Sequence, residues 1–354
     1  MYHELCDRGK SVFNISSLDS RHSKYRRLLK HGLSGRAIRE SEAHSFVQSL
    51  AREPGKFQHH LRRNAAAVIM KAAYGYTVSE ENDPFIGIAE ESAKISGWAL
   101  APGRWIVDYY PLVIRFIPSW FPFAGFKRQL NSLSDVPHNW VKMQMERGTH
   151  IESFTSRLIR PSPSGPGGSN TADAESEDLI KWAAGGLYAG ASDTWTVSAL
   201  TSFILLIALY PNIQKQAQQE IKVLRYAPPY RIRVIQDDVY QGYQIPKDST
   251  VIVNTWAIFH DPALYPEPFE FNPHRFIDNA KYPDSDVNPD PRGFAFVMVK
   301  GLQFAEISIL LIMSRVISNF EVSVPAGTVP PVEFTSGITS HLKPFELSIR
   351  LRKV

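Results

Sequence analysis

The feature that most constrains this chain is a long apolar segment, rich in small residues, at residues 179–209. Its length corresponds to about eight helical turns at roughly 3.6 residues per turn. The segment ends at Tyr210 and Pro211, and a proline in this place is a natural helix stop. A helix that is apolar around most of its circumference needs other elements packed around it. The segment therefore predicts a central buried helix.

Composition narrows the possible classes of protein. With 354 residues, 44% of them hydrophobic, the chain can bury one large core or two modest ones. The 39 Lys and Arg residues are spread along the chain against 35 Asp and Glu, which argues against nucleic acid as a partner. Cys6 is the only cysteine, so a disulfide framework, a cysteine-based zinc site and a thiol redox pair are excluded.

Periodicity and turn residues predict a mainly α protein with a small β region toward the carboxyl end, in a single domain. One predicted helix carries apolar residues at core-facing spacing, namely Ala65, Val68, Ile69, Ala72 and Ala73. The predicted elements are helices at residues 24–46, 60–76, 212–224 and 303–320, a short hairpin at residues 238–253 and a strand-like stretch at residues 334–351.

Two segments interrupt the helical pattern. Residues 98–126 are crowded with aromatic side chains and broken by prolines. They are either a hydrophobic lid or membrane-surface contact, or a filled corner of the core. Residues 160–178 are rich in Pro, Gly and Ser and then acidic, which predicts a flexible linker. The apolar runs at residues 199–209 and 307–313 fall short of the roughly 18 residues that span a membrane, so no transmembrane segment is expected in this chain.

Inside the predicted central helix, the sequence AGASDTWT at residues 189–196 places polar side chains in an apolar setting. Ser192, Asp193 and Thr194 compete with helical hydrogen bonding. They form either a helix cap or a satisfied core network, or they open a groove beside a cofactor. In the second interpretation Asp193 and Thr194 pass protons to a bound oxygen species. A flat cofactor would approach the backbone at the small residues Ala189, Gly190 and Ala191.

Residues 190–194 resemble the oxygen-activation helix of cytochrome P450 enzymes, and the resemblance extends over nearly the whole chain. It is most specific at YQGYQIPKDSTVIVNTWAIFHDPALYPEPFEFNPHRF, residues 240–276, which is similar to the family's strand pair, helix and meander with its Pro-x-Arg-Phe signature. Shorter matches are YRRLLKHGLS at residues 25–34, the access region at residues 108–128 and VLRYAPP at residues 223–229.

The resemblance implies the mainly α fold of that family and the activity of a fungal heme-thiolate monooxygenase of secondary metabolism. It also implies heme as cofactor, an NADPH-dependent reductase and a hydrophobic small molecule as partners, and a place at the endoplasmic reticulum membrane. Arg26 would pair with a heme propionate, because a guanidinium forks onto a carboxylate. Arg225 and Arg275 would belong to a buried charge network under the meander, and Asp193 and Thr194 would handle protons during oxygen cleavage.

The chain departs from the family at the iron-binding loop. The family pattern there is Phe-Gly-x-Gly-x-Arg-x-Cys-x-Gly, whereas this chain passes from Phe296 to Gly301 through VMVK. No cysteine is present to bind iron in this loop, and Cys6 falls where the family places no ligand, so we assign no metal ligand. Lys222 also stands where the family has the glutamate that pairs with Arg225.

Two further gaps separate the chain from the family pattern. QKQAQQEI at residues 214–221 runs directly into VLRYAPP, although the family separates the two by another helix and loops, and APPYRIRV is compressed before the strand pair. Good matches resume directly on both sides of each gap, which indicates excision, as in a mis-spliced or truncated gene, more than gradual decay. We therefore expect one family domain at residues 1–354 that lacks its amino-terminal part and its heme-cysteine loop. Several functions remain open. The first is a monooxygenase that this chain represents incompletely, and the second is a heme-free, catalytically inactive remnant or binding protein. A third is a peripheral membrane module built on residues 98–126.

Overall fold

The structure is a computed structural model. It describes residues 6–12, 15, 18–32, 36–79, 83–99, 105–116, 123–160, 174–191, 195–220, 231–233, 236–247, 249–252, 254–272, 275, 288–289, 302–328, 330, 332–335 and 341–352. Contacts divide the chain into two compact units. The first unit is Met1–Ile221 with Gln303–Val354, and the second unit is Lys222–Leu302.

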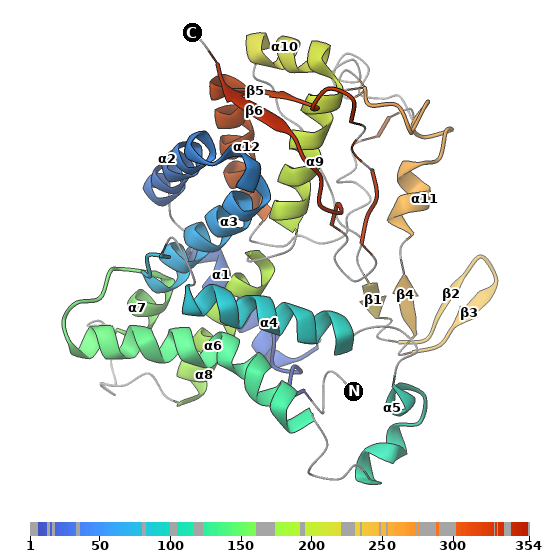
Figure 1. The fold of residues 1–354 in the computed structure, drawn as a ribbon. Coiled ribbons are helices and arrows are strands. Elements are labelled where there is room, and N and C mark those ends of the chain that lie inside the picture. Colours follow the sequence, from blue (N-terminus) through green and yellow to red (C-terminus); the bar gives the residue numbers. More distant parts are fainter. Residues whose placement is uncertain are drawn as a thin grey trace. The chain divides into compact units, whose positions relative to one another are not determined.

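The first unit consists mainly of helices (Figure 1). Its α-helices are α1 (Ser20–Gly32), α2 (Arg36–Arg52), α3 (Phe57–Tyr74), α4 (Pro84–Ala99), α5 (Ile106–Tyr109), α6 (Phe123–Glu146), α7 (Phe154–Ile159), α8 (Ala174–Ala191), α9 (Trp195–Leu209), α10 (Pro211–Glu220) and, from its second residue, α12 (Leu302–Asn319). Two short 3-10 helices, η1 (Pro54–Lys56) and η2 (Pro111–Phe116), also belong to it.

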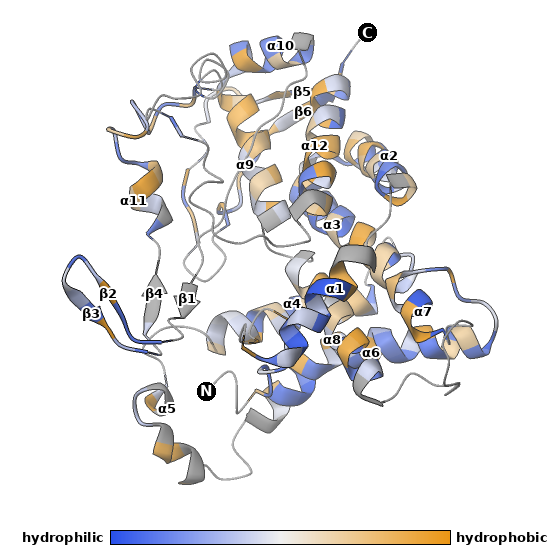
Figure 2. Ribbon diagram, turned by 180° about the vertical axis from the view of Figure 1, so that it is seen from behind, coloured by the Kyte–Doolittle hydropathy of each residue, from blue (hydrophilic) through white to orange (hydrophobic). Residues whose placement is uncertain are grey.

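Helix α8 lies among the other helices of this unit, because it packs against α1, α3, α6, α7 and α9. Helix α3 contributes the face that the sequence predicted. All five of its core-facing positions, Ala65, Val68, Ile69, Ala72 and Ala73, are buried, so the prediction of a core helix is confirmed. Helix α9 carries mostly hydrophobic residues along its length (Figure 2). Its buried side chains include Leu200, Phe203 and Ile204.

Gly75 ends α3 in a left-handed conformation with a φ of 70°. The backbone N–H of Gly75 donates to the Lys71 carbonyl at 3.0 Å, and that of Tyr76 donates to the Met70 carbonyl at 3.3 Å. These bonds satisfy carbonyl groups that the end of a helix leaves unpaired. A side chain is also excluded by space, since a Cβ atom on Gly75 would lie 2.5 Å from the carbonyl oxygen of Ile151.

A two-stranded antiparallel sheet follows α12, formed by β5 (Phe320–Ser323) and β6 (Ser348–Leu351). Beside β5, a buried glutamine of α10 takes the place of a further strand. The Nε2 atom of Gln214 donates to the Val322 carbonyl at 2.7 Å, and its Oε1 atom accepts the Val322 N–H at 2.8 Å. One side chain thereby satisfies both backbone groups of Val322.

The second unit contains two antiparallel strand pairs and a short helix, α11 (Thr255–Phe259). Strand β1 (Arg231–Arg233) pairs with β4 (Thr250–Ile252), and β2 (Asp238–Tyr240) pairs with β3 (Tyr243–Ile245). Gln241 and Gly242 connect β2 and β3 with φ angles of 50° and 85°. Two positive φ angles in a two-residue loop are the geometry that matches the twist of a hairpin.

The mainly α prediction is confirmed, but three of its details need correction. The linker predicted at residues 160–178 is too long, since α8 already begins at Ala174, where acidic residues of the first turns favour the helix dipole and meet lysines. The hairpin ends at Ile245, and β4 pairs instead with β1, which was not predicted. Within the described part of residues 334–351, only β6 is a strand, beside one bridge between Phe334 and Leu342.

In the described part of the chain, no single helix is long and apolar enough to cross a membrane. One bent pair, α9 with α10, passes that test by length and composition, with an angle of 107° between the two helices.

Candidate cofactor site

The small residues that predict a cofactor groove lie in the last turn of α8. Ala189 is partly buried and packs against the core cluster of the first unit, and Gly190 is half-buried. Ala191 is the last residue of the helix. Ser192, Asp193 and Thr194 lie outside the described residues, so their proton-handling role stays a prediction. The sequence predicted a single helix at residues 179–209. The structure describes α8 before residues 192–194 and α9 after them.

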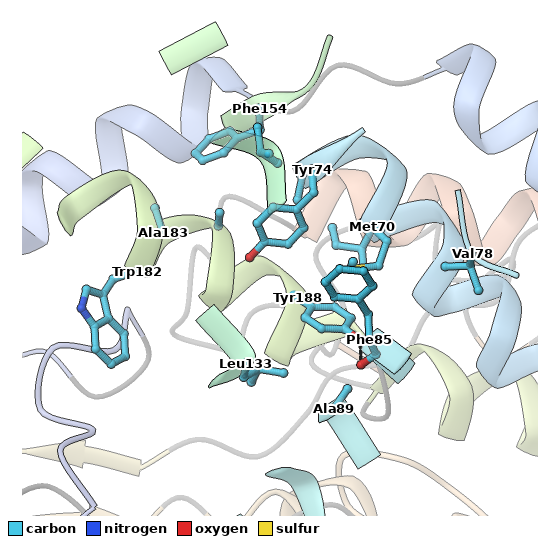
Figure 3. Close-up of a cluster of buried hydrophobic side chains, with 14 of the residues drawn as sticks. Met70, Tyr74, Val78, Phe85, Ala89, Leu133, Phe154, Trp182, Ala183 and Tyr188 are labelled. Atoms are coloured by element: carbon cyan, nitrogen blue, oxygen red, sulfur yellow. Dashed lines mark hydrogen bonds between the residues drawn. The ribbon is translucent and has the colours of Figure 1, made fainter. Parts of the chain in front are cut away.

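The core cluster fixes α8 against α3 and α4 (Figure 3). The rings of Tyr74 on α3 and Tyr188 on α8 meet edge to face, with centroids 6.4 Å apart. The Tyr188 hydroxyl donates to the Phe85 carbonyl of α4 at 2.6 Å. Burial raises the pKa of both tyrosines well above its ordinary value, so both are neutral phenols. The end of α8 that bears Ala189 is therefore held by a packed, uncharged core.

Close packing with α6 explains another small residue of α8. A Cβ atom on Gly185 would lie 2.1 Å from the Oγ atom of Ser134 on α6. The two helices can approach this closely only because Gly185 has no side chain. Part of the small-residue character of α8 therefore serves helix packing, a role that the sequence analysis missed. The adjacent glycines at residues 185–186 were the available signal.

Charged groups join the beginning of α8 to α6. The Nζ atom of Lys142 lies 2.6 Å from the Oε1 atom of Glu177, and the Nε2 atom of His138 lies 3.3 Å from the same oxygen. The Lys142 hydrogen bond lowers the pKa of Glu177. Burial lowers the pKa of His138, although Glu177 opposes the shift. A second bridge joins Lys181 to Asp135 at 2.9 Å.

Arg26, the predicted propionate partner, is exposed on α1. Its neighbour Tyr25 is buried in the core cluster, and the Tyr25 hydroxyl donates to the Lys10 carbonyl at 3.0 Å. Among the described residues, no hydrogen bond or ion pair engages the Arg26 guanidinium. Because α1 packs against α8, the structure places Arg26 and Ala189 on two helices in contact. An anionic group could reach Arg26 without breaking an existing pair.

Arg275 of the second unit binds the meander through oxygen atoms of uncharged groups. Its guanidinium donates to the backbone carbonyls of Pro266, Glu267 and Glu270 and to the Oδ1 atom of Asn288. The bonds to Glu267 and Glu270 measure 2.9 Å and 3.3 Å. Arg225 lies outside the described residues, so a charge network that links the two arginines stays a prediction.

In the described part of the aromatic segment at residues 98–126, the large apolar side chains are exposed or partly buried. Trp98 forms a small cluster with Trp105 and Phe126, with ring centroids 4.5 Å and 5.1 Å apart. By contrast, α5 and η2 present large apolar side chains to solvent: Ile106, Tyr109, Tyr110, Leu112 and Phe116, each at least 65% exposed. Orange, hydrophobic residues are visible on α5 in Figure 2. Trp98 is itself 40% exposed, so the described residues favour an exposed apolar surface, and the interpretation as a filled corner of the core stays a prediction.

The residues of this chain do not fit a heme held by a thiolate. Cys6 supplies the only thiol, and its side chain is fully buried. Burial raises the pKa of the Cys6 thiol, whereas an iron ligand has to be the thiolate. Within the described residues, no group of three or more His, Cys, Asp or Glu side chains could hold a metal ion either. We therefore derive no catalytic step through heme for this chain.

Comparison with known proteins matches the chain to one family. The cytochrome P450 family model matches residues 2–227 and 223–349. A similar relative is cytochrome P450 monooxygenase 208 of Postia placenta, 34% identical, with 88% of this chain and 67% of the relative covered. Cytochrome P450 monooxygenase ppsD of Aspergillus oryzae is 30% identical, with 94% and 72% covered. O-methylsterigmatocystin oxidoreductase of Aspergillus flavus is 28% identical, with 84% and 62% covered.

These relatives contain internal residues without a counterpart here. The Postia alignment runs over 358 positions but uses 88% of 354 residues, about 312, so about 46 positions of that relative face a gap. For the Aspergillus oryzae protein, an alignment of 387 positions uses 94% of this chain, so about 54 positions of that relative face a gap. For the Aspergillus flavus protein, an alignment of 338 positions uses 84% of this chain, so about 41 positions of that relative face a gap. With the family model matched over most of its length, the chain belongs to the cytochrome P450 family of oxidoreductases.

Proposed function

We propose that the protein encoded by this gene is a fungal heme-thiolate monooxygenase that oxidises a hydrophobic small molecule of secondary metabolism. The observation that carries the proposal is the family match over residues 2–349, together with relatives named as monooxygenases. The oxidoreductase of Aspergillus flavus, named for O-methylsterigmatocystin, supports a substrate from secondary metabolism. Electrons would come from an NADPH-dependent reductase, and heme would be the cofactor.

Named residues take roles within this proposal. Arg26 would pair with a heme propionate, and the absence of a competing partner among the described residues supports this role. Ala189, Gly190 and Ala191 would let the cofactor approach the backbone of α8. Asp193 and Thr194 would move protons. Arg225 and Arg275 would have the structural role of holding the meander.

The proposal includes a membrane surface as a partner, at the endoplasmic reticulum. The exposed apolar side chains of α5 and η2 support it, because large exposed apolar patches mark interaction surfaces. The alternative function, a heme-free and inactive remnant or binding protein, is supported by the lack of an available thiolate.

Expression of the genomic locus tests the monooxygenase directly. The locus, with its introns, is introduced into a fungal host together with a reductase, and metabolites are compared after growth under ¹⁸O₂. A monooxygenase places one labelled oxygen atom in each product molecule. Heme-loaded protein that transfers no label to any metabolite would contradict the proposal, provided that the reductase reduces its heme.

A further inference from the structure

The internal gap against the relatives is similar in size for proteins from three different fungi. It amounts to about 40 to 55 positions in each alignment. If each relative had gained its own insertions independently, the three counts would be unrelated. The missing positions are therefore a property of this chain, and they lie inside the matched region.

One gap falls at residues 223–227. The family model matches in two pieces that overlap at these residues, next to the place where the resemblance implies a further helix and loops that this chain lacks. The structure divides in the same place, because the first unit ends at Ile221 and the second begins at Lys222.

A second gap falls between Phe296 and Gly301, where VMVK replaces the longer iron-binding pattern. Cys6 cannot compensate for it. Segment 6–12 is fixed to α6 and α8: Arg8 donates to the Leu130 carbonyl at 3.2 Å, and its guanidinium lies 5.1 Å from the centroid of the Trp182 ring. Release of Cys6 as a ligand would require these contacts to break.

We infer that this chain is a shortened form of the protein that its gene encodes, that it lacks two internal segments of the family fold, and that it takes up no thiolate-bound heme. The inference rests on family membership and on the packing of Cys6, and it does not depend on the proposed reaction. The helices of the first unit pack around α8.

The first experiment reads the native transcript. We expect two additional in-frame segments, one near residues 221–230 and one between Phe296 and Gly301, that together encode about 40 to 55 residues. A transcript that encodes the present sequence without additions would overturn the inference that segments are missing. This result is independent of catalysis, so it is distinct from a failure of the proposed function.

The second experiment uses the purified chain and its Cys6→Ala variant, each titrated with hemin. We expect neither protein to form a thiolate spectrum. We also expect a thiol reagent to react with Cys6 on the order of a hundredfold more slowly in the native protein than in urea, because reaction requires local opening. A one-to-one heme complex with a thiolate spectrum that Cys6→Ala abolishes would overturn the inference. If Cys6→Ala fails to fold, a thiolate spectrum of the parent chain alone overturns it.

Discussion

At the scale of single residues, Tyr74 and Tyr188 are buried tyrosines of one cluster whose hydroxyls have different surroundings. The Tyr188 hydroxyl donates to Phe85, whereas the Tyr74 hydroxyl has no hydrogen-bond partner among the described residues. A buried donor without a partner costs about 1 to 3 kcal/mol. We expect Tyr74→Phe to raise the free energy of unfolding by about 1 kcal/mol and Tyr188→Phe to lower it by about 1 kcal/mol.

Urea unfolding of the two variants, followed by circular dichroism, checks this contrast. Each variant loses one tyrosine hydroxyl group from the same cluster, so each variant is the control for the other. Equal losses of stability in both variants would show that the Tyr74 hydroxyl has a partner.

His138 makes the stability of the α6 and α8 contact depend on pH. Burial lowers the pKa of His138 below its ordinary value of 6.5, in a setting that also holds Glu177, Lys142 and Lys181. The unfolded chain therefore binds a proton at a higher pH than the folded chain does. The free energy of unfolding falls as the pH decreases below 6.5.

The variants His138→Gln and His44→Gln test this assignment. His44 is exposed on α2 and is the control. We expect His138→Gln to lose less stability than the parent between about pH 7.5 and about pH 5.5, while His44→Gln behaves like the parent. Parallel losses in all three proteins, measured by urea unfolding, would rule out His138 as the source.

At the scale of elements, Gly75 and Gly148 have nearly the same backbone conformation, with φ angles of 70° and 68°. They differ in space, since a Cβ atom on Gly75 would meet Ile151 and one on Gly148 would meet nothing within 4 Å. We expect Gly148→Ala to cost about 1 kcal/mol of stability and Gly75→Ala about 2 to 4 kcal/mol. Thermal unfolding measures both, and equal costs would mean that the contact with Ile151 yields easily.

The apolar surface of α5 and η2 yields a prediction about membranes. Leu112 and Phe116 are 71% and 80% exposed, and the control residues Tyr240 and Tyr243 of the second unit are 64% and 75% exposed. We expect Leu112→Ser with Phe116→Ser to weaken binding to phosphatidylcholine and phosphatidylserine vesicles roughly tenfold to hundredfold. Tyr240→Ser with Tyr243→Ser should have little effect. A similar loss in both double variants would exclude a specific role for α5 and η2.

Sequence patterns identified the elements whose conformation follows from local residue spacing. The apolar spacing in α3 and α12 predicted both helices closely, because the apolar positions of each helix include residues that are buried in the core. Strand β1 was missed, since its three residues depend on pairing with β4, about twenty residues away in the sequence. The two-sided binding of Val322 by Gln214 also joins distant segments, and no local pattern signals it.

The candidate site can be compared with the sequence only where its residues are described. Arg26 and Ala189 were named from their motifs, and the structure places them on helices in contact. The Gly185 contact with Ser134 was missed, because it arises only when α6 and α8 pack together. The roles of Asp193, Thr194 and Arg225 remain predictions.

At the scale of the whole molecule, the chain combines a packed helical unit with a second unit that begins at a sequence junction. Burial of apolar side chains around α8 stabilises the first unit. Oxygen chemistry, by contrast, depends on a thiolate that this chain does not supply.

The absorbance spectrum of the reduced, carbon-monoxide-treated protein tests most directly whether this chain binds heme through a thiolate. It is recorded in parallel for the present chain and for the product of the native transcript, at equal concentration and after the same hemin treatment. We expect the strongly red-shifted thiolate band only in the product of the native transcript. The same band, at the same height per mole of protein, in the present chain would contradict the account.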